Sequence, residues 1–181
     1  DGTLLDLHFD NYFWLTHLPK VVAERHFPEL IEAKAQKRAT ELLKQKYTQV
    51  EGTLNWYSTD YWSQELSLPI MKIKSQLTHL IKYRSDALSF LNWLGANNIK
   101  RVLVTNAHPD NLELKHQITG IQNHFEHCFV SHQINFAKII ADRIIFMDKG
   151  VILADQPAKE FFEKPNSHRA RLFLANVSDL I

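Results

Sequence analysis

The sequence has little of several residue types that define whole classes of protein. Only one of its 181 residues is cysteine, Cys128, so the chain cannot form an internal disulfide, and this usage fits a reducing compartment. Lysine and arginine number 21 against 20 aspartate and glutamate, so no overall field attracts a nucleic acid or an anionic membrane. No apolar run has the length of a transmembrane helix, and no basic stretch followed by an apolar one marks a signal peptide. We therefore expect a cytoplasmic protein with no nucleic-acid partner and no direct membrane insertion.

A long helical block takes up the first half of the chain. From about 11 to 93, apolar residues recur at three- and four-residue spacing, which predicts helices. The stretch TLNWYSTDYWSQELSLP is expected to place Trp56, Tyr57, Tyr61 and Trp62 on one helix that ends near Pro69. Such aromatic residues are usual in cores, and over a site they can also stack on a base.

The pattern changes to alternating helix and strand after this block. SDALSFLNWLGANNIKRVLVTN predicts a helix that stops at Gly95 and a buried parallel strand, 101–104, that ends in Thr105 and Asn106. A helix over about 110–119 and a second strand in HFEHCFVSH follow. We therefore expect an α/β fold, a Rossmann-like parallel-sheet core with a helical block inserted early.

The end of the chain has a different pattern again. Two apolar runs, 144–147 and 151–154, flank an Asp-Lys-Gly turn and predict a β-hairpin. Two short helices are expected after it, on either side of Pro165.

The first residues, DGTLLD, and the strand end VLVTN together form the candidate site. Asp-Gly alone is a common turn, but here it is paired with an apolar strand that ends in Thr105 and Asn106 before a helix. Phosphate sites in open α/β sheets lie at the carboxyl ends of parallel strands, where a hydroxyl and backbone N–H groups converge. The pairing predicts a phosphoryl site. The alternative is that Thr105 and Asn106 only cap the following helix.

These motifs resemble a known family. DGTLLD, a helical insert and VLVTNAH are similar to haloacid dehalogenase-superfamily phosphatases. DGTLLDLHFDNYFW, TLNWYSTDYW and LVTNAHPDNLELK resemble the bacterial GMP/IMP 5′-nucleotidase branch, over about 1–133. The resemblance implies Mg²⁺-dependent hydrolysis of a small-molecule phosphomonoester, a purine nucleoside 5′-monophosphate, through an aspartyl-phosphate.

The resemblance also implies roles for individual residues. The family motif is Asp-x-Asp-Gly-Thr, and Asp1 matches its second Asp, which is the general acid/base and a magnesium ligand through its backbone carbonyl. Thr105 would hydrogen-bond the phosphoryl group, with Asn106 offering its backbone N–H. Lys138 in HQINFAK matches the family's lysine, although the usual glycine and proline are absent. The attacking Asp would lie two residues ahead of Asp1, so we expect the printed residues alone to have negligible turnover.

The tail resembles a different family. VSHQINFAKIIADRIIFMDKGVILADQPAKEFFEKPNSHRARLFL is similar to the C-terminal end of polar amino-acid ABC transporter ATP-binding subunits, where His132 would match the histidine that contacts the γ-phosphate. The printed sequence has no Gly-x-x-x-x-Gly-Lys phosphate loop. We infer a hybrid of a haloacid dehalogenase-like core (1–10 and 85–133), a helical cap (11–84) and an ABC-ATPase-like segment (134–181). The alternatives are an ABC ATP-binding fragment and a non-functional fusion, and the oligomeric state is left open.

Overall fold

The structure is a computed structural model, and it describes residues 2–105, 107–130, 138, 141–148 and 151–178. The chain divides into two compact units, Asp1–Val130 and Ser131–Ile181. The borders expected between the core, the cap and the ABC-like segment remain predictions. No helix of the described residues is both long and apolar enough to cross a bilayer.

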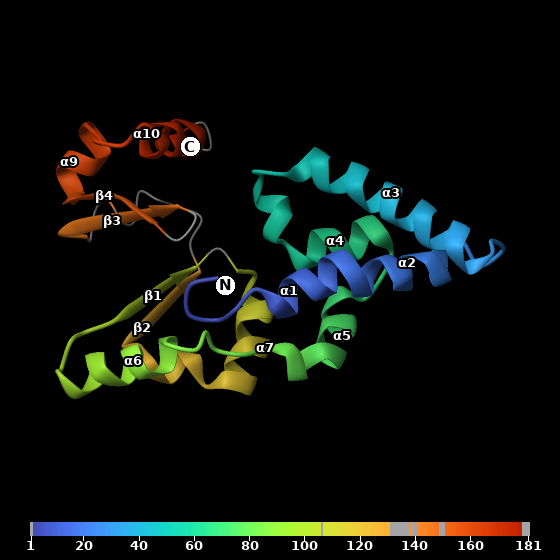
Figure 1. Ribbon diagram of the computed structural model, residues 1–181, viewed down its shortest axis with the longest axis horizontal. Helices are drawn as coiled ribbons and strands as arrows, with labels where there is room; N and C mark the ends of the chain where they lie inside the picture. The colour runs from blue at the N-terminus through green and yellow to red at the C-terminus, as the bar shows by residue number, and fades with distance from the viewer. Residues whose placement is uncertain (1, 106, 131–137, 139–140, 149–150, 179–181) are drawn as a thin grey trace. The chain divides into compact units, whose positions relative to one another are not determined.

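The first unit begins with the predicted helical block. Its elements are α1 (His8–Tyr12), η1 (Phe13–His17), α2 (Leu18–His26), α3 (Glu32–Val50), η2 (Leu54–Tyr57), α4 (Thr59–Leu66), α5 (Ile70–Lys74) and η3 (Ser75–Leu80). The first three form a continuous helical run with a π-helical turn in its middle, and α2 packs against α3 (Figure 1).

One of the expected helices is in fact two elements. The prediction of a single helix carrying Trp56, Tyr57, Tyr61 and Trp62 is wrong, because the backbone is extended at Ser58 (φ −80°, ψ 111°). The Ser58 hydroxyl accepts a hydrogen bond from the backbone N–H of Tyr61 at 3.1 Å and caps α4. The short helix η2 therefore ends before the cap, and its two aromatic residues belong to a separate turn.

The helical block has a continuous apolar core. Fully or almost fully buried side chains come from α1, η1, α2, α3, α4 and α5, and include Phe9, Phe13, Leu18, Val22, Leu43, Trp62, Leu66 and Ile70. Burial of a side chain of this size contributes about 1.5–3 kcal/mol relative to leaving it in water. The block therefore has the apolar contacts to hold its short helices together.

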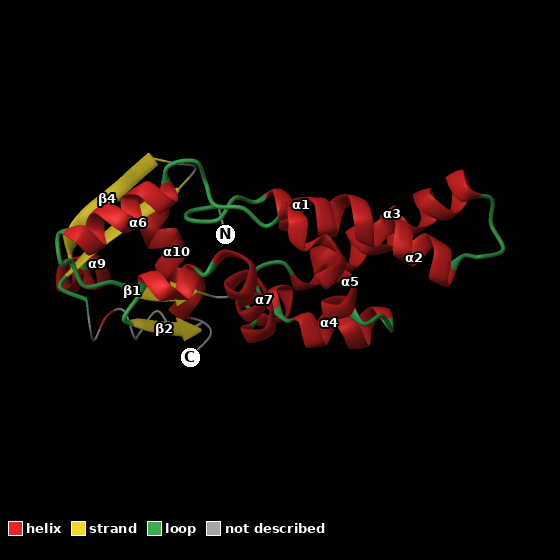
Figure 2. Cartoon of the chain, turned by 90° about the horizontal axis from the view of Figure 1, so that it is seen from below, coloured by secondary structure: helices red, strands yellow, loops and turns green. Residues whose placement is uncertain are grey.

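The predicted helix–strand alternation follows the block. It consists of α6 (Ala87–Ala96), β1 (Val102–Thr105), α7 (Pro109–Thr119), η4 (Ile121–His124) and β2 (His127–Val130). The strands pair in parallel, with Val102 opposite His127 and Thr105 opposite Val130. In Figures 1 and 2 the helices α1 to α5 gather at one end of this unit and the two strands at the other. The predicted parallel pairing is thus confirmed.

The expected burial of the first strand is wrong. Val102 is 44% exposed and Val104 is 49% exposed. In the part of the chain that the structure describes, β1 is paired with β2 alone. A neighbouring strand covers an edge of β1 and not its faces, so the face that carries both valines stays accessible.

The DGTLLD segment is held in place by the chain leaving the helical block. The backbone N–H of Arg84 donates to the carbonyl of Leu4 at 2.9 Å, and that of Asp6 donates to the carbonyl of Lys82 at 3.0 Å. Leu5 and Tyr83 form an antiparallel bridge between them. The first motif therefore lies beside the segment that leads into α6.

A buried carboxylate joins three helices of this unit. Asp10 on α1 accepts hydrogen bonds from Lys74 on α5, at 2.9 Å, and from Lys115 on α7, at 2.6 Å. The side chains of the two lysines are 1% and 3% exposed. Burial raises the pKa of Asp10, but the two ammonium groups outweigh it and hold that pKa below its usual value. For both lysines burial lowers the pKa by more than Asp10 raises it.

The second unit contains the predicted hairpin and helices. Strands β3 (Arg143–Asp148) and β4 (Val151–Pro157) pair antiparallel, and α9 (Ala158–Glu163) and α10 (His168–Ser178) follow. A small core of Ala154, Phe161 and Ala170 lies between them. The guanidinium of Arg143 forms a two-pronged ion pair with Asp155 across the hairpin.

Leucine truncation tests the core of the helical block. Leu43→Ala, in the buried side of α3, should lower the free energy of unfolding by about 2–5 kcal/mol because it removes methyl contacts and leaves a cavity. Leu15→Ala, at a side chain that is 67% exposed, should change it by less than about 0.5 kcal/mol. Urea unfolding followed by tryptophan fluorescence measures both. Equal effects of the two substitutions would contradict the assigned core.

The Asp10 cluster makes a prediction about pH. Asp10→Asn removes the carboxylate to which both buried ammonium groups donate, so it should lower the free energy of unfolding at pH 7 by about 3–5 kcal/mol. Because the folded pKa of Asp10 lies below the usual 3.8, the wild type should lose this contribution only as the pH falls through that lowered value.

Two variants serve as controls for the cluster. Lys74→Met should be milder than Asp10→Asn, since Asp10 keeps Lys115 as its partner. Glu24→Gln, at an exposed position of α2, should have almost no effect. An Asp10→Asn protein as stable as the wild type at pH 7 would contradict the cluster.

Candidate functional site

A cavity of about 580 Å³ opens where β1 ends. The helical block and the α/β part of the first unit both contribute to its walls. Its lining residues are Thr3, Leu7, Asp10, Asn11, Trp14, Trp56, Tyr57, Thr59, Lys74, Val104, Thr105, Ala107, His108 and Asn111. The predicted strand end and the DGTLLD segment therefore meet at one hollow, through Thr105 and Thr3.

Thr105 lines the cavity at the end of β1. It is the last residue of β1, and its oxygen accepts a hydrogen bond from the N–H of Ala107 at 3.1 Å. A hydroxyl that accepts one hydrogen bond still has its own hydrogen to donate. The helix α7 starts at Pro109 with His108 as its N-cap, so the alternative that Thr105 caps this helix is wrong. The N-terminal end of α7 next to Thr105 favours an anion.

The charges around Thr105 also favour an anion. Lys74 lines the 580 Å³ cavity, and Lys115 lines a smaller one of about 180 Å³ that Thr105 also faces. Both lysines donate to the carboxylate of Asp10. Their ammonium groups place positive charge beside the cavities that Thr105 lines, and positive charge attracts an anionic group.

A second polar contact joins the loop after β1 to the helical block. The imidazole Nδ1 of His108 lies 2.9 Å from the hydroxyl oxygen of Thr59, and its Nε2 lies 3.4 Å from a carboxylate oxygen of Asp60. Thr59 is buried at the start of α4. The loop that carries Ala107 and His108 is thus held against this helix.

One wall of the cavity is aromatic. Trp14, Trp56 and Tyr57 line it, and the side chains of Trp56 and Tyr57 are 39% and 44% exposed. The ring of Trp56 packs edge-on against Tyr47, with centroids 6.0 Å apart. The indole N–H of Trp62 donates to the backbone carbonyl of Trp56 at 3.2 Å. Buried aromatic residues therefore support partly accessible rings that can pack against a flat ligand.

Of the predicted site residues, only some lie in the part of the chain that the structure describes. Thr105 lines the cavity, whereas Asp1 and Asn106 lie outside the described residues, so their roles stay predictions. Lys138 belongs to the second unit and is exposed, and its predicted role near the phosphoryl group is untested.

Four polar residues of this site were not predicted from the sequence, the buried Lys74, Lys115 and Asn111 and the half-buried Asp10. A signal existed for Lys74, because it lies four residues after Ile70 and three before Leu77, on the buried stripe of α5 and η3. A lysine at such a position needs a carboxylate partner. Nothing in the local pattern identified that partner as Asp10, which is 64 residues away.

The described residues do not by themselves form a magnesium site. Among them, no group of three or more histidine, cysteine, aspartate or glutamate side chains is arranged to hold a metal. The carboxylate of Asp10 in the cavity is already engaged by two ammonium groups. The predicted ligand Asp1 is not among the described residues.

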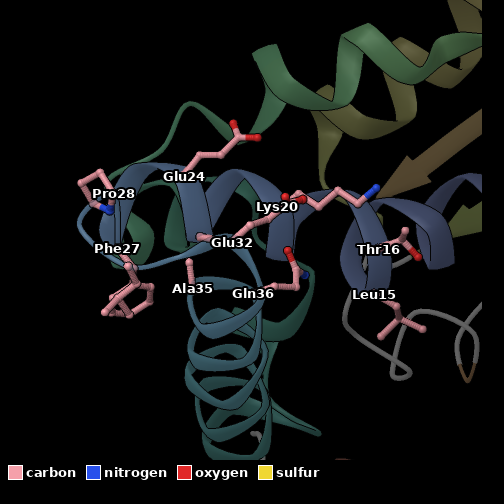
Figure 3. Close-up of a pocket in the computed structure, with 11 residues that line it drawn as sticks. Leu15, Thr16, Lys20, Glu24, Phe27, Pro28, Glu32, Ala35 and Gln36 are labelled. Carbon is pink, nitrogen blue, oxygen red and sulfur yellow. The ribbon is translucent and has the colours of Figure 1, made fainter.

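A larger hollow lies elsewhere in the helical block. It has a volume of about 700 Å³ and lies between α2 and α3 (Figure 3). Its walls include Lys20, Glu24, Phe27 and Gln36. None of the residues around Thr105 lines it, so the smaller cavity at the strand end is the candidate site.

Comparison with known proteins gives two different similarities. The GMP/IMP nucleotidase YrfG of Escherichia coli is 34% identical over 173 residues, which cover 88% of this chain and 75% of that protein. The glutamine transport ATP-binding protein GlnQ of Geobacillus stearothermophilus is 48% identical over 48 residues, 26% of this chain and 20% of that protein. The nucleotidase similarity covers more of the chain than the predicted 1–133. The 88% of this chain aligned with the nucleotidase and the 26% aligned with GlnQ together exceed the whole chain, so the two alignments overlap.

The fold has a solved counterpart. A haloacid dehalogenase (HAD) phosphatase from Thermococcus onnurineus superposes with a TM-score of 0.56 at 20% identity, over 71% of this chain and 57% of that one. No protein-family profile matches the chain. The predicted α/β fold class and the two-family resemblance are confirmed. Through its similarity to the nucleotidase over most of both chains, the protein belongs to the haloacid dehalogenase superfamily of phosphatases.

Proposed function

We propose that the cavity at the end of β1 binds a purine nucleoside 5′-monophosphate for hydrolysis of its phosphate ester. The observation that carries this proposal is that Thr105 opens into a cavity that aromatic rings and Thr3 of the first motif also line. The cavity combines an anion-binding end with an aromatic wall. A nucleoside monophosphate has the matching parts, a phosphate and a flat base.

The phosphate is assigned to the end of the cavity near Thr105. There the Thr105 hydroxyl, the first backbone N–H groups of α7 and the positive charge of Lys74 and Lys115 are available to attract phosphate oxygens. In this proposal the backbone N–H of Asn106 adds a further donor.

The nucleoside is assigned to the aromatic wall. Stacking on an aromatic side chain contributes about 1–3 kcal/mol per base in proteins that bind single-stranded nucleic acids. Trp56 and Tyr57 have the exposed area for such a contact. The name of the E. coli relative specifies GMP and IMP, which supports a purine for this chain.

Hydrolysis in this proposal follows the family's two-step chemistry. A carboxylate two residues ahead of Asp1 attacks phosphorus and forms an aspartyl-phosphate, and Asp1 protonates the leaving 5′ oxygen. Water then attacks the phosphorus, with Asp1 as the base, and releases phosphate and the free carboxylate. Lys138 is assigned to the phosphoryl oxygens by the resemblance alone.

The family's chemistry implies magnesium, which when bound would stabilise the negative charge of the phosphoryl group. Among the described residues, no group of three or more histidine, cysteine, aspartate or glutamate side chains could hold it. The cytoplasmic location is likewise a proposal, supported by the single cysteine. The ABC-like similarity covers a quarter of the chain, and the printed sequence has no phosphate loop, so ATP binding is not proposed.

Nucleotide binding to the 181-residue chain tests the phosphate end. IMP should bind more tightly than inosine, because inosine lacks the phosphate. Thr105→Ala should weaken IMP binding about 10-fold or more, and Thr105→Ser should restore most of it, since a hydrogen bond to a charged group is worth about 1.5–3 kcal/mol. Isothermal titration calorimetry measures these affinities.

A matched control uses a threonine outside the cavity. Thr40→Ala, at an exposed position of α3, should leave the affinity for IMP unchanged. Equal binding of IMP and inosine, or an unchanged affinity after Thr105→Ala, would overturn the assignment of this cavity.

A further inference from the structure

Among the described residues that line the candidate cavity, one buried side-chain atom has no hydrogen-bond partner. Asn111 lies in the first turn of α7, its side chain lines the cavity, and the residue is only 7% exposed. Its carboxamide oxygen Oδ1 is buried without a hydrogen-bond partner. A buried acceptor left unpaired costs about 1–3 kcal/mol, so an acceptor of this kind inside a cavity points to a ligand that donates to it.

The neighbouring polar groups in the cavity are already engaged. The Thr59 hydroxyl contacts His108, the Lys74 ammonium group donates to Asp10, and the Thr105 hydroxyl accepts from Ala107. Among the described residues that line this cavity, Asn111 is the one with a buried side-chain oxygen or nitrogen that lacks a partner. The cavity therefore presents a buried, unpaired hydrogen-bond acceptor at a defined place in its wall.

The place of Asn111 in the cavity favours the nucleoside as its donor. Phosphate oxygens at pH 7 accept hydrogen bonds and cannot pair with Oδ1. Asn111 follows Thr105 by six residues and shares the cavity with Trp56 and Tyr57. A ligand with its phosphate at Thr105 and its base against these rings has its nucleoside hydrogen-bond donors in the same hollow.

We propose that Asn111 determines base specificity, with its Oδ1 accepting the N1–H of a 6-oxopurine. This inference rests on the proposed function. Guanine and hypoxanthine, the bases named for the E. coli relative, both have an N1–H donor beside the O6 acceptor. Adenine has a bare N1 that accepts hydrogen bonds, so AMP places an acceptor against Oδ1. With Oδ1 placed against N1, a 6-oxopurine satisfies the buried oxygen and the bare N1 of adenine does not.

The affinity ratio of IMP to AMP tests this role separately from phosphate binding. The wild type should bind IMP about 10- to 100-fold more tightly than AMP, as expected for one buried hydrogen bond gained or lost. Asn111→Leu has a similar shape and no acceptor, so it should bring the ratio close to 1. Asn111→Asp keeps an acceptor oxygen and adds a negative charge. It should therefore weaken the binding of all nucleotides by charge repulsion, while the remaining affinity should still favour IMP over AMP.

Two further measurements separate this role from a structural one. Asn111→Leu removes an unsatisfied buried oxygen, so its free energy of unfolding should equal or exceed that of the wild type. Asn123→Leu, at an exposed asparagine of η4, should leave the IMP to AMP ratio unchanged. Far-ultraviolet circular dichroism verifies that each variant is folded.

The outcomes distinguish the two proposals. If Thr105→Ala weakens IMP binding but Asn111→Leu keeps the preference for IMP over AMP, the role proposed for Asn111 is wrong and the proposed function stands. If Asn111→Leu instead changes the ratio of IMP to 2′-deoxy-IMP, the acceptor serves the ribose and the base assignment is overturned. If the wild type binds neither nucleotide, the proposed function itself fails.

Discussion

The contact between Asp10 and its two lysines is the interaction on which the candidate site depends. Asp10 belongs to α1, Lys74 to α5 and Lys115 to α7, so one carboxylate connects both ends of the helical block to the helix that follows β1. The three groups are largely buried, and hydrogen bonds between charged groups are stronger in such surroundings than in water. This cluster, together with the contact between His108 and Thr59, fixes the two halves of the cavity relative to each other.

The same cluster links the stability of the first unit to its electrostatics. Burial lowers the pKa of both lysines, and the carboxylate of Asp10 opposes that effect. Burying a charge costs free energy unless a partner compensates it. The apolar core around Phe9 and Phe13 offsets this cost, and the centroids of both rings lie 4.9 Å from the ammonium nitrogen of Lys74. The ammonium group of Lys74 is therefore tolerated in the wall of the cavity.

The sequence predicted those features of the fold that depend on local patterns. The strand ending at Thr105, the helix after it and the hairpin near the end of the chain all follow from short-range periodicity and turn residues. The break at Ser58 was missed because the aromatic spacing was favoured over the capping signal of a serine. The exposure of Val102 and Val104 depends on which other elements pack against β1, and the sequence pattern of the strand itself does not contain that information.

The site could be predicted only where a motif or a strand end marked it. Thr105 was found by that reasoning, whereas Asp10 and Asn111 were not, because their importance arises from contacts and cavities formed over long sequence separations. The Oδ1 atom of Asn111 is a buried acceptor without a hydrogen-bond partner in the free protein. A ligand that donates a hydrogen bond to it removes this cost. It would bind the folded first unit and not the unfolded chain, so its binding would stabilise the arrangement of block and strands that forms the cavity.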